Sequence, residues 1–431
     1  MHRRGSDGWL PTVAPRNRLW ATAVLVVALV VAGCSATPAT PPTTLKVLMT
    51  DDWVTAPFID AVREFERTHP NVRVAVDKGP IGLQADVVRA GTSSGAAPDV
   101  VQGHAFSAAN QGLAQPLDDV WQSKLNAEEF SPGALEDVTW NGMRYGVPLD
   151  TNAMVLMYNV DHFKEAGVPE PDPKTPMSLQ AFADLARSLT KGDRRALAIP
   201  TSNWWTYGWI KADAGELVQV GSDGKSTLTL DDPKVVAGVA FLADLIDKNL
   251  AFPPRGVDAH SDDAFALFGA GRVSMHTSGS WDIANIKKRN LSINYRTVLM
   301  PQEPGGGTVM GGSSMWVPVA SRNRDLAVEF MTLLASDPYA LRFAKEEGRL
   351  PVRLRVFDDP YFSDPDRAVF LEQLKTAHPH KLEAYPEASA DFAFALDEVL
   401  GDRKDPGEAL RAAQLKAQTD TTSTTGATSP P

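Results

Sequence analysis

Residues 45–76 read LKVLMTDDWVTAPFIDAVREFERTHPNVRVAV, and this stretch decides the fold class of the 431-residue chain. A short apolar run over residues 45–50 predicts a strand, and Pro57 then opens a segment with apolar side chains at helical spacing. Residues 71–76 alternate apolar and polar side chains with period two, which predicts a second strand. A helix that includes Val87 and Val88 and then a strand over residues 98–101 continue the alternation. Alternation of this kind predicts an α/β fold with right-handed crossovers and a largely parallel sheet.

The rest of the chain continues the alternation, and its length suits two lobes of about 150–200 residues each. The patterns predict a strand over residues 272–276 and helices over residues 179–189, 232–250, 262–270, 324–347, 364–377 and 391–400.

The N-terminal segment predicts export and lipid attachment. Four arginines precede an uncharged stretch over residues 19–32, which is too short to span a bilayer and is typical of a signal peptide over residues 1–33. Cys34, the only cysteine, ends a Val-Ala-Gly-Cys run that resembles the bacterial lipobox, so we expect it to carry lipid. Residues 34–44 are rich in Pro and Thr and predict a tether, and residues 419–431 predict a disordered tail.

The net charge argues against nucleic-acid partners. The chain carries −11, and residues 1–33 hold four Arg and one Asp, so the part after the predicted cleavage carries −14. Such a surface repels nucleic acid and anionic lipid headgroups.

Aromatic side chains in polar segments indicate a ligand site. Eight of the ten tryptophans follow residue 34, and several stand beside Gly, Ser, Asn or Asp. Trp53 follows two aspartates at the end of the first strand, and Trp204 and Trp205 lie in the run Thr-Ser-Asn-Trp-Trp-Thr-Tyr-Gly-Trp. The C–H face of a pyranose stacks on an indole ring, while its hydroxyls need polar donors and acceptors. These loops therefore favour sugar binding, and burial in the core is the alternative for each Trp.

The order of motifs along residues 45–418 resembles the family-1 extracellular solute-binding proteins, the group of carbohydrate receptors that are similar to maltose-binding protein. The matching motifs are PDVVQG (98–103), GLAQPLD (112–118), YGVPLDTN (145–152), FGAGRVSM (268–275), SGSW (278–281), GGSSMWVP (311–318) and LPVR (350–353).

This resemblance implies a two-lobed periplasmic-binding-protein fold with three hinge crossings and a ligand cleft between the lobes. The first lobe would hold residues 45–149 and 278–322, and the second residues 150–277 and 323–418. Hinges would lie near residues 148–152 and 277–281. The implied binding residues are Asp52, Trp53, Gln102, His104, Asp150, Asn152, Trp204, Trp205, Ser280, Trp281, Gly312, Ser313, Trp316 and Arg353.

The function implied is reversible capture of a carbohydrate on the outer face of the cell membrane and its delivery to the permease of an ABC importer. We expect no catalysis, no cofactor, no metal and a monomer. A receptor for a glycerophosphodiester or another phosphate-bearing solute is the main alternative, for which Arg353, Arg144 and Lys211 would be the phosphate ligands. A polyamine receptor would use Asp51, Asp52 and Asp150.

Enzymatic alternatives have less support in the sequence. A glycoside hydrolase needs two carboxylates across a cleft, and no motif singles out such a pair. The run Ser278-Gly-Ser280 leads into Trp281 and lacks the flanking pattern of a serine hydrolase elbow, and the glycine runs at residues 304–307 and 311–312 lack the Lys-Ser/Thr of a phosphate-binding loop. His378 and His380 form the one close histidine pair, which is more typical of a solvated turn than of a metal site.

Overall fold

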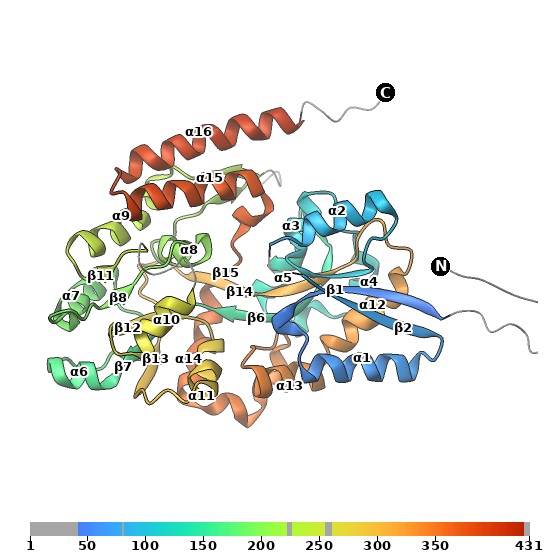
Figure 1. The fold of residues 1–431 in the computed structure, drawn as a ribbon, viewed down its shortest axis with the longest axis horizontal. Coiled ribbons are helices and arrows are strands. Elements are labelled where there is room, and N and C mark those ends of the chain that lie inside the picture. Colours follow the sequence, from blue (N-terminus) through green and yellow to red (C-terminus); the bar gives the residue numbers. More distant parts are fainter. Residues whose placement is uncertain (1–41, 80–81, 222–225, 255–260, 426–431) are drawn as a thin grey trace, which may run out of the picture. The chain divides into compact units, whose positions relative to one another are not determined.

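The computed structural model describes residues 42–79, 82–221, 226–254 and 261–425 (Figure 1). The predicted signal peptide, Cys34 and most of the predicted tether lie outside the described residues. No helix within the described residues is long and apolar enough to cross a bilayer.

Strands and helices alternate along the chain, as the sequence predicts. The strands are β1 (Thr43–Thr50), β2 (Val72–Gly79), β3 (Val100–Gly103), β4 (Thr139–Trp140), β5 (Met143–Arg144), β6 (Gly146–Ala153), β7 (Val155–Asn159), β8 (Leu197–Ala198), β9 (Val218–Val220), β10 (Ser226–Leu228), β11 (Ala251–Phe252), β12 (Met275–Ser278), β13 (Tyr295–Val298), β14 (Thr308–Trp316) and β15 (Ala377–His378). The helices are α1 (Ala56–Thr68), α2 (Gln84–Ser94), α3 (Ala105–Asn110), α4 (Asp118–Ser123), α5 (Pro132–Val138), α6 (Val160–Ala166), α7 (Leu179–Leu189), α8 (Asn203–Ala212), α9 (Pro233–Asp247), α10 (Ser261–Gly269), α11 (Trp281–Lys288), α12 (Arg324–Leu334), α13 (Asp337–Glu347), α14 (Pro365–Gln373), α15 (Pro386–Leu396) and α16 (Pro406–Thr425). Two of the 3₁₀ turns bear on the site, η1 (Asp51–Trp53) and η6 (Lys381–Ala384).

The largest sheet is mixed and has the order β15-β14-β3-β1-β2, with β6 on β14. Strand β1 runs parallel to both β2 and β3, which confirms the predicted parallel α/β pattern. Strand β14 returns antiparallel between β3 and β6, so it brings residues 308–316 beside the ends of strands formed some 160–210 residues earlier. A smaller antiparallel sheet has the order β12-β7-β13.

The first hydrophobic core lies between the large sheet and the helices that follow it. Phe58 and Phe65 on α1 are buried and meet the ring of Phe330 on α12 edge-on, with ring centroids 6.2 and 5.3 Å apart. Each fully buried Phe contributes about 1.5–3 kcal/mol of transfer free energy. Helices α12 and α13 therefore pack in the core of β1, β2 and β3.

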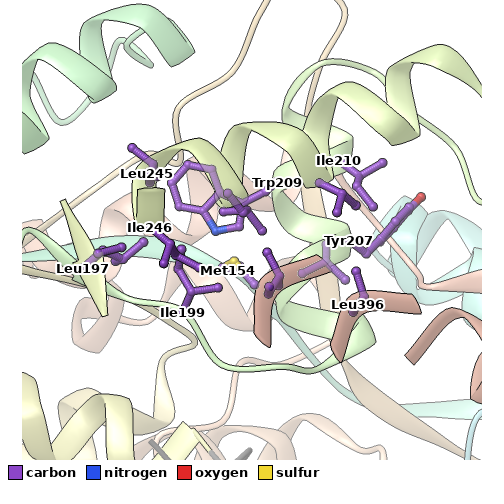
Figure 2. Close-up of a cluster of buried hydrophobic side chains, with 14 of the residues drawn as sticks. Met154, Leu197, Ile199, Tyr207, Trp209, Ile210, Leu245, Ile246 and Leu396 are labelled. Carbon is purple, nitrogen blue, oxygen red and sulfur yellow. The ribbon is translucent and has the colours of Figure 1, made fainter. Parts of the chain in front are cut away.

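The second core is built around α8 and α9 (Figure 2). Trp209 of α8 packs against Phe182 of α7 with ring centroids 4.9 Å apart, and Leu245 and Ile246 of α9 lie in the same cluster. Helices α15 and α16 lie side by side and close this core with Leu396 and Leu410.

Two stretches pack differently from the division into lobes that the resemblance implies. Helices α12 and α13, expected in the second lobe, join the first core because their apolar side chains pack against the phenylalanines of α1. Strand β13, expected in the first lobe, pairs with β7 of the smaller sheet. The number of crossings between the lobes stays a prediction. At the C-terminus α16 runs to Thr425, so residues 419–425 are helical where we expected a disordered tail.

Candidate functional site

A cleft of about 980 Å³ opens where β1 and β3 end. Its volume suits a small organic ligand, for which sites of about 300–1,000 Å³ are usual. Ligands of open α/β sheets bind outside the carboxyl ends of the strands, which is the position of this cleft. The predicted site residues that line it are Asp52, Trp53, Gln102, His104, Asp150, Asn152, Trp281, Gly312, Ser313 and Trp316.

A chain of hydrogen bonds fixes the polar floor of the cleft. The side-chain oxygen of Gln102 accepts from the backbone N–H of Thr50 at 2.9 Å, and the Gln102 amide nitrogen donates to Ser313 Oγ at 3.1 Å. Ser313 donates its backbone N–H and its hydroxyl to Asp150 Oδ1, at 2.8 and 3.1 Å. Because the Ser313 proton is used towards Asp150, the Ser313 oxygen is left to accept from Gln102. The orientation of every group in the chain is therefore determined.

Gly312 allows β14 to approach β6 closely at this floor. Its φ is +108°, a conformation that residues with a side chain rarely adopt, and it faces Thr151 across the ladder. A Cβ on Gly312 would lie 2.5 Å from the carbonyl oxygen of Asp150 and 2.6 Å from Thr151 Cα. Only glycine fits there without moving the backbone that carries Asp150.

Arg349 follows α13 and provides the guanidinium of the cleft. Its Nη2 donates to Asp52 Oδ2 at 2.8 Å and to the Asp52 carbonyl oxygen at 3.0 Å, and its Nη1 lies 3.6 Å from Asp150 Oδ2. The guanidinium also covers the ring of Trp53, with 3.8 Å between its central carbon and the ring centroid. Trp53 is only 2% exposed, so it supports Arg349 and offers little ring surface to a ligand.

The two carboxylates beside Arg349 have different pKa values. Burial raises the pKa of Asp150 to about 6, and Arg349 and the donors of Ser313 offset only part of this increase. Burial also pushes the pKa of Asp52 upward, but hydrogen bonds from Thr50 and Arg349 outweigh it and hold the pKa below its usual value. Asp52 is therefore the firmly ionised partner of Arg349.

His104 forms a charged bridge on another wall. Its Nδ1 lies 2.5 Å from Asp137 Oδ1 and its Nε2 lies 3.1 Å from Glu383 Oε2. One carboxylate is hydrogen-bonded to Nδ1 and a second lies beside Nε2, and their negative charges favour the imidazolium form of the ring. Burial opposes this charge, but Glu383 and Asp137 outweigh it and raise the pKa of His104 to about 10. Ser107 of α3 donates to the Glu383 carbonyl oxygen at 2.7 Å and thereby holds η6 in place.

Each cationic side chain that lines the described part of the cleft has a carboxylate partner. Arg89 pairs with Asp86 at 2.9 Å, and Lys288 pairs with Glu347 at 3.3 Å. The pairs of Arg349 and His104 complete the set. The described wall thus presents no unpaired cation to an incoming anion.

Trp281 is the half-buried indole of the cleft wall. It begins α11, and Asn152 fixes this helix end by accepting from the Ser280 backbone N–H at 3.0 Å and donating to the Ser280 hydroxyl at 2.8 Å. The indole folds back over Gly279, where a Cβ would lie 2.1 Å from a ring carbon. Ser280 is thus buried behind the cleft wall and positions Trp281, rather than lining the cleft as predicted.

Trp204 and Trp205, also predicted to bind, lie on α8 behind Trp281. Their indole N–H groups donate to the carbonyl oxygens of Met310 and Thr277, at 3.0 and 3.1 Å. The Trp204 ring lies 5.7 Å from that of Trp281 and supports it. Neither ring lines the cleft, because the run that we interpreted as a loop is a helix packed on the second core.

The structure places Arg353 away from the cleft. It is buried, pairs with Glu129, donates to the Ala335 carbonyl oxygen at 2.9 Å and covers the Phe130 ring. Arg353 therefore holds the first core together, and the prediction that it binds ligand is not supported by its position. Arg349 lines the cleft in its place.

Several cleft residues escaped the sequence analysis. They are contributed by helices and by the turns that follow them, and they include Gln84, Arg89, Asn285, Lys288, Glu347, Arg349 and Glu383. The only local signal was Gly348, which ends α13 in the left-handed conformation and marks the turn that carries Arg349.

The fold and the cleft together define a class of protein: an α/β binding protein that holds a small polar molecule between strand ends and helix ends. The chain belongs to the family of bacterial extracellular solute-binding proteins, whose family model matches residues 60–369. Membership makes the protein a receptor of the kind that serves ABC transporters rather than an enzyme.

Known proteins of several ligand types are similar to this chain. The diacetylchitobiose binding protein DasA of Streptomyces coelicolor is 28% identical over 311 residues, which cover 70% of each chain. The substrate-binding protein Lmo0181 of Listeria monocytogenes, solved with cycloalternan, superposes with a TM-score of 0.76 at 17% identity and covers 88% of this chain and 99% of its own. UgpB of Mycobacterium tuberculosis, solved with glycerophosphocholine, has a TM-score of 0.73 at 20% identity and covers 88% and 98%. The periplasmic-binding-protein fold is confirmed, and the ligand class is left open between sugars and glycerophosphodiesters.

Proposed function

We propose that this protein is a carbohydrate receptor that captures an uncharged saccharide in the cleft and delivers it to the permease of an ABC importer. The observation that carries this proposal is the half-buried indole of Trp281 beside a hydrogen-bonding floor in which the cations are already paired. An indole stacks on the C–H face of a sugar ring, while the floor contacts its hydroxyls.

The charge pattern favours a sugar over a phosphate-bearing solute. Phosphate recognition depends on Arg or Lys side chains that are available to the phosphate oxygens. Arg349 is already held by Asp52, and the negative charge of Asp52 would repel a phosphate placed beside it. The similarity to DasA, a diacetylchitobiose binding protein, makes an N-acetylated disaccharide the first saccharide to test.

Attachment to the membrane is part of the same proposal. Cys34 would carry lipid after cleavage of residues 1–33, and residues 34–42 would connect it to the strand β1, which begins at Thr43. The receptor would then work as a monomer at the outer face of the cell membrane.

Isothermal titration calorimetry of the purified protein tests the ligand class. The panel is diacetylchitobiose, maltose, acarbose, glycerophosphocholine and spermidine. Saturable binding of one saccharide, recovered unchanged, is expected. Binding of glycerophosphocholine alone would refute the proposal, and a modified saccharide would contradict the receptor function itself.

A tryptophan comparison then tests the stacking surface. Trp281→Ala should weaken saccharide binding about tenfold to a hundredfold, because an aromatic stacking surface of this kind contributes roughly 1–3 kcal/mol. Trp205→Phe is the matched control, since its ring does not line the cleft. Equal affinities of the two variants would remove Trp281 from the site.

A further inference from the structure

Arg349 and Asp150 face each other across a gap in the floor of the cleft. The distance from Arg349 Nη1 to Asp150 Oδ2 is 3.6 Å, which is longer than the usual hydrogen bond of about 2.7–3.2 Å. Each side chain is held through its other atoms. Arg349 Nη2 donates to Asp52, and Asp150 Oδ1 accepts from Ser313. One donor and one acceptor are thus presented to the cleft side by side.

We propose that this gap binds one hydroxyl group of the ligand, with the hydroxyl oxygen accepting from Arg349 Nη1 and its proton donated to Asp150 Oδ2. This inference rests on the proposed carbohydrate function and names the pair of residues that determines ligand class. A hydroxyl is suited to the gap because it is both a donor and an acceptor.

The other candidate ligand groups each fail on one side of the gap. An ionised phosphate oxygen has no proton to donate to Asp150. The negative charges of Asp150 and Asp52 also repel it, while Arg349 attracts it. An ammonium group has no lone pair with which to accept from Arg349, and the positive charge of Arg349 repels it. The pair therefore selects against both charged alternatives and selects for a neutral alcohol.

The surrounding contacts hold the gap at this width. The guanidinium of Arg349 lies over the Trp53 ring, and Thr50 donates its hydroxyl to Asp52 Oδ1 at 2.6 Å. Asp150 is held by two donors of Ser313. The donor and the acceptor are thus oriented before the ligand arrives, which reduces the ordering cost of binding.

The test is calorimetry of wild type, Arg349→Gln, Asp150→Asn and the double variant with diacetylchitobiose, maltose and glycerophosphocholine. Each single change should weaken the saccharide that wild type binds about tenfold to a hundredfold, because hydrogen bonds to charged groups are the strong ones. The double variant should bind the saccharide only slightly more weakly than the single variant with the larger loss of affinity, since both residues contact the same hydroxyl.

The matched control is the Arg342–Asp60 pair, an Arg–Asp contact of 3.1 Å that lies outside the cleft lining. Arg342→Gln and Asp60→Asn should leave saccharide affinity unchanged. Arg349→Lys keeps the charge and should give an intermediate loss, and circular dichroism melting of all variants separates misfolding from loss of a contact.

The outcomes distinguish this inference from the proposed function. Saccharide binding that survives Arg349→Gln and Asp150→Asn unchanged, or losses that add fully in the double variant, would overturn the hydroxyl site and leave the carbohydrate receptor standing. Binding of glycerophosphocholine that is lost in Arg349→Gln and strengthened in Asp150→Asn would overturn both.

Discussion

Replacing His104 by Gln should remove a stabilising charge from the wall of the cleft. The variant leaves Asp137, which is 3% exposed, and Glu383 facing a neutral amide. The folded-state pKa of His104 is about 10, against about 6.5 for an ordinary histidine, which corresponds to at most about 5 kcal/mol. Because the side chains of His104 and Glu383 are 29% and 34% exposed, solvent weakens their attraction. We therefore expect a loss of about 2–3 kcal/mol in the free energy of unfolding.

The sign of the pH dependence follows from the direction of the shift. The folded-state pKa of His104 is raised, so its stabilisation is fully present below about pH 6.5 and is lost as the pH rises towards 10. The difference in unfolding free energy between wild type and His104→Gln should therefore shrink steadily between pH 6.5 and 10. Urea unfolding followed by circular dichroism at half-unit pH steps measures this difference.

His162→Gln provides the control for this titration. Burial and Arg194 lower the pKa of His162, so titration of His162 should not make its difference from wild type shrink above pH 6.5, and any slope there should have the opposite sign to that of His104→Gln. A flat difference for His104→Gln, or the same slope for both variants, would refute the assignment of a charged bridge between Asp137 and Glu383.

Three further predictions concern the floor of the cleft and the arginine behind it. Gly312→Ala should cost at least about 3 kcal/mol of stability because its Cβ would meet backbone, whereas Gly142→Ala, with positive φ but open space, should cost about 1 kcal/mol; urea midpoints compare them. Asp150→Asn should raise the free energy of unfolding by about 1–2 kcal/mol at pH 7.5, because a buried carboxylate with a raised pKa is costly to ionise, and this gain should vanish below about pH 4. Arg353→Gln should destabilise the fold by about 3 kcal/mol without changing the affinity for diacetylchitobiose in calorimetry, and an affinity loss would return Arg353 to the site.

The strand ends of the site were predictable because their signal is local. Asp52 and His104 closely follow apolar strands and Gln102 lies in the last residues of one, and the edge of a parallel sheet gathers such residues. The motif around residues 311–316 singled out Gly312 and Ser313, and the structure shows them beside Asp150 because the glycine-rich run permits the close approach of β14 and β6.

The choice between the two arginines was not predictable, because it depends on pairings between distant segments. Leu350 pairs with Thr151, which puts Arg349 beside Asp150, whereas Arg353 pairs with Phe130 and turns into the core. The Trp204–Trp205 run has the polar neighbours of a loop. It is nevertheless a helix, and its indole N–H groups donate hydrogen bonds to carbonyl oxygens of β14 and β12. The packing of α12 on α1 joins residues more than 260 positions apart, and no local pattern marks it.

The pairing of the cleft cations with carboxylates of the same protein also bears on the surroundings in which the receptor works. A site that attracts its ligand through unpaired charge loses affinity as dissolved salt shortens the range of that attraction, which is about 10 Å at 0.1 M ionic strength. Here the positive charges of Arg349, Lys288 and Arg89 are paired with carboxylates of the same protein. A neutral saccharide therefore displaces no ions when it enters. Capture should therefore proceed with nearly the same affinity in dilute and in saline media, which suits a receptor that operates outside the cell, where the composition of the water is not under the control of the bacterium.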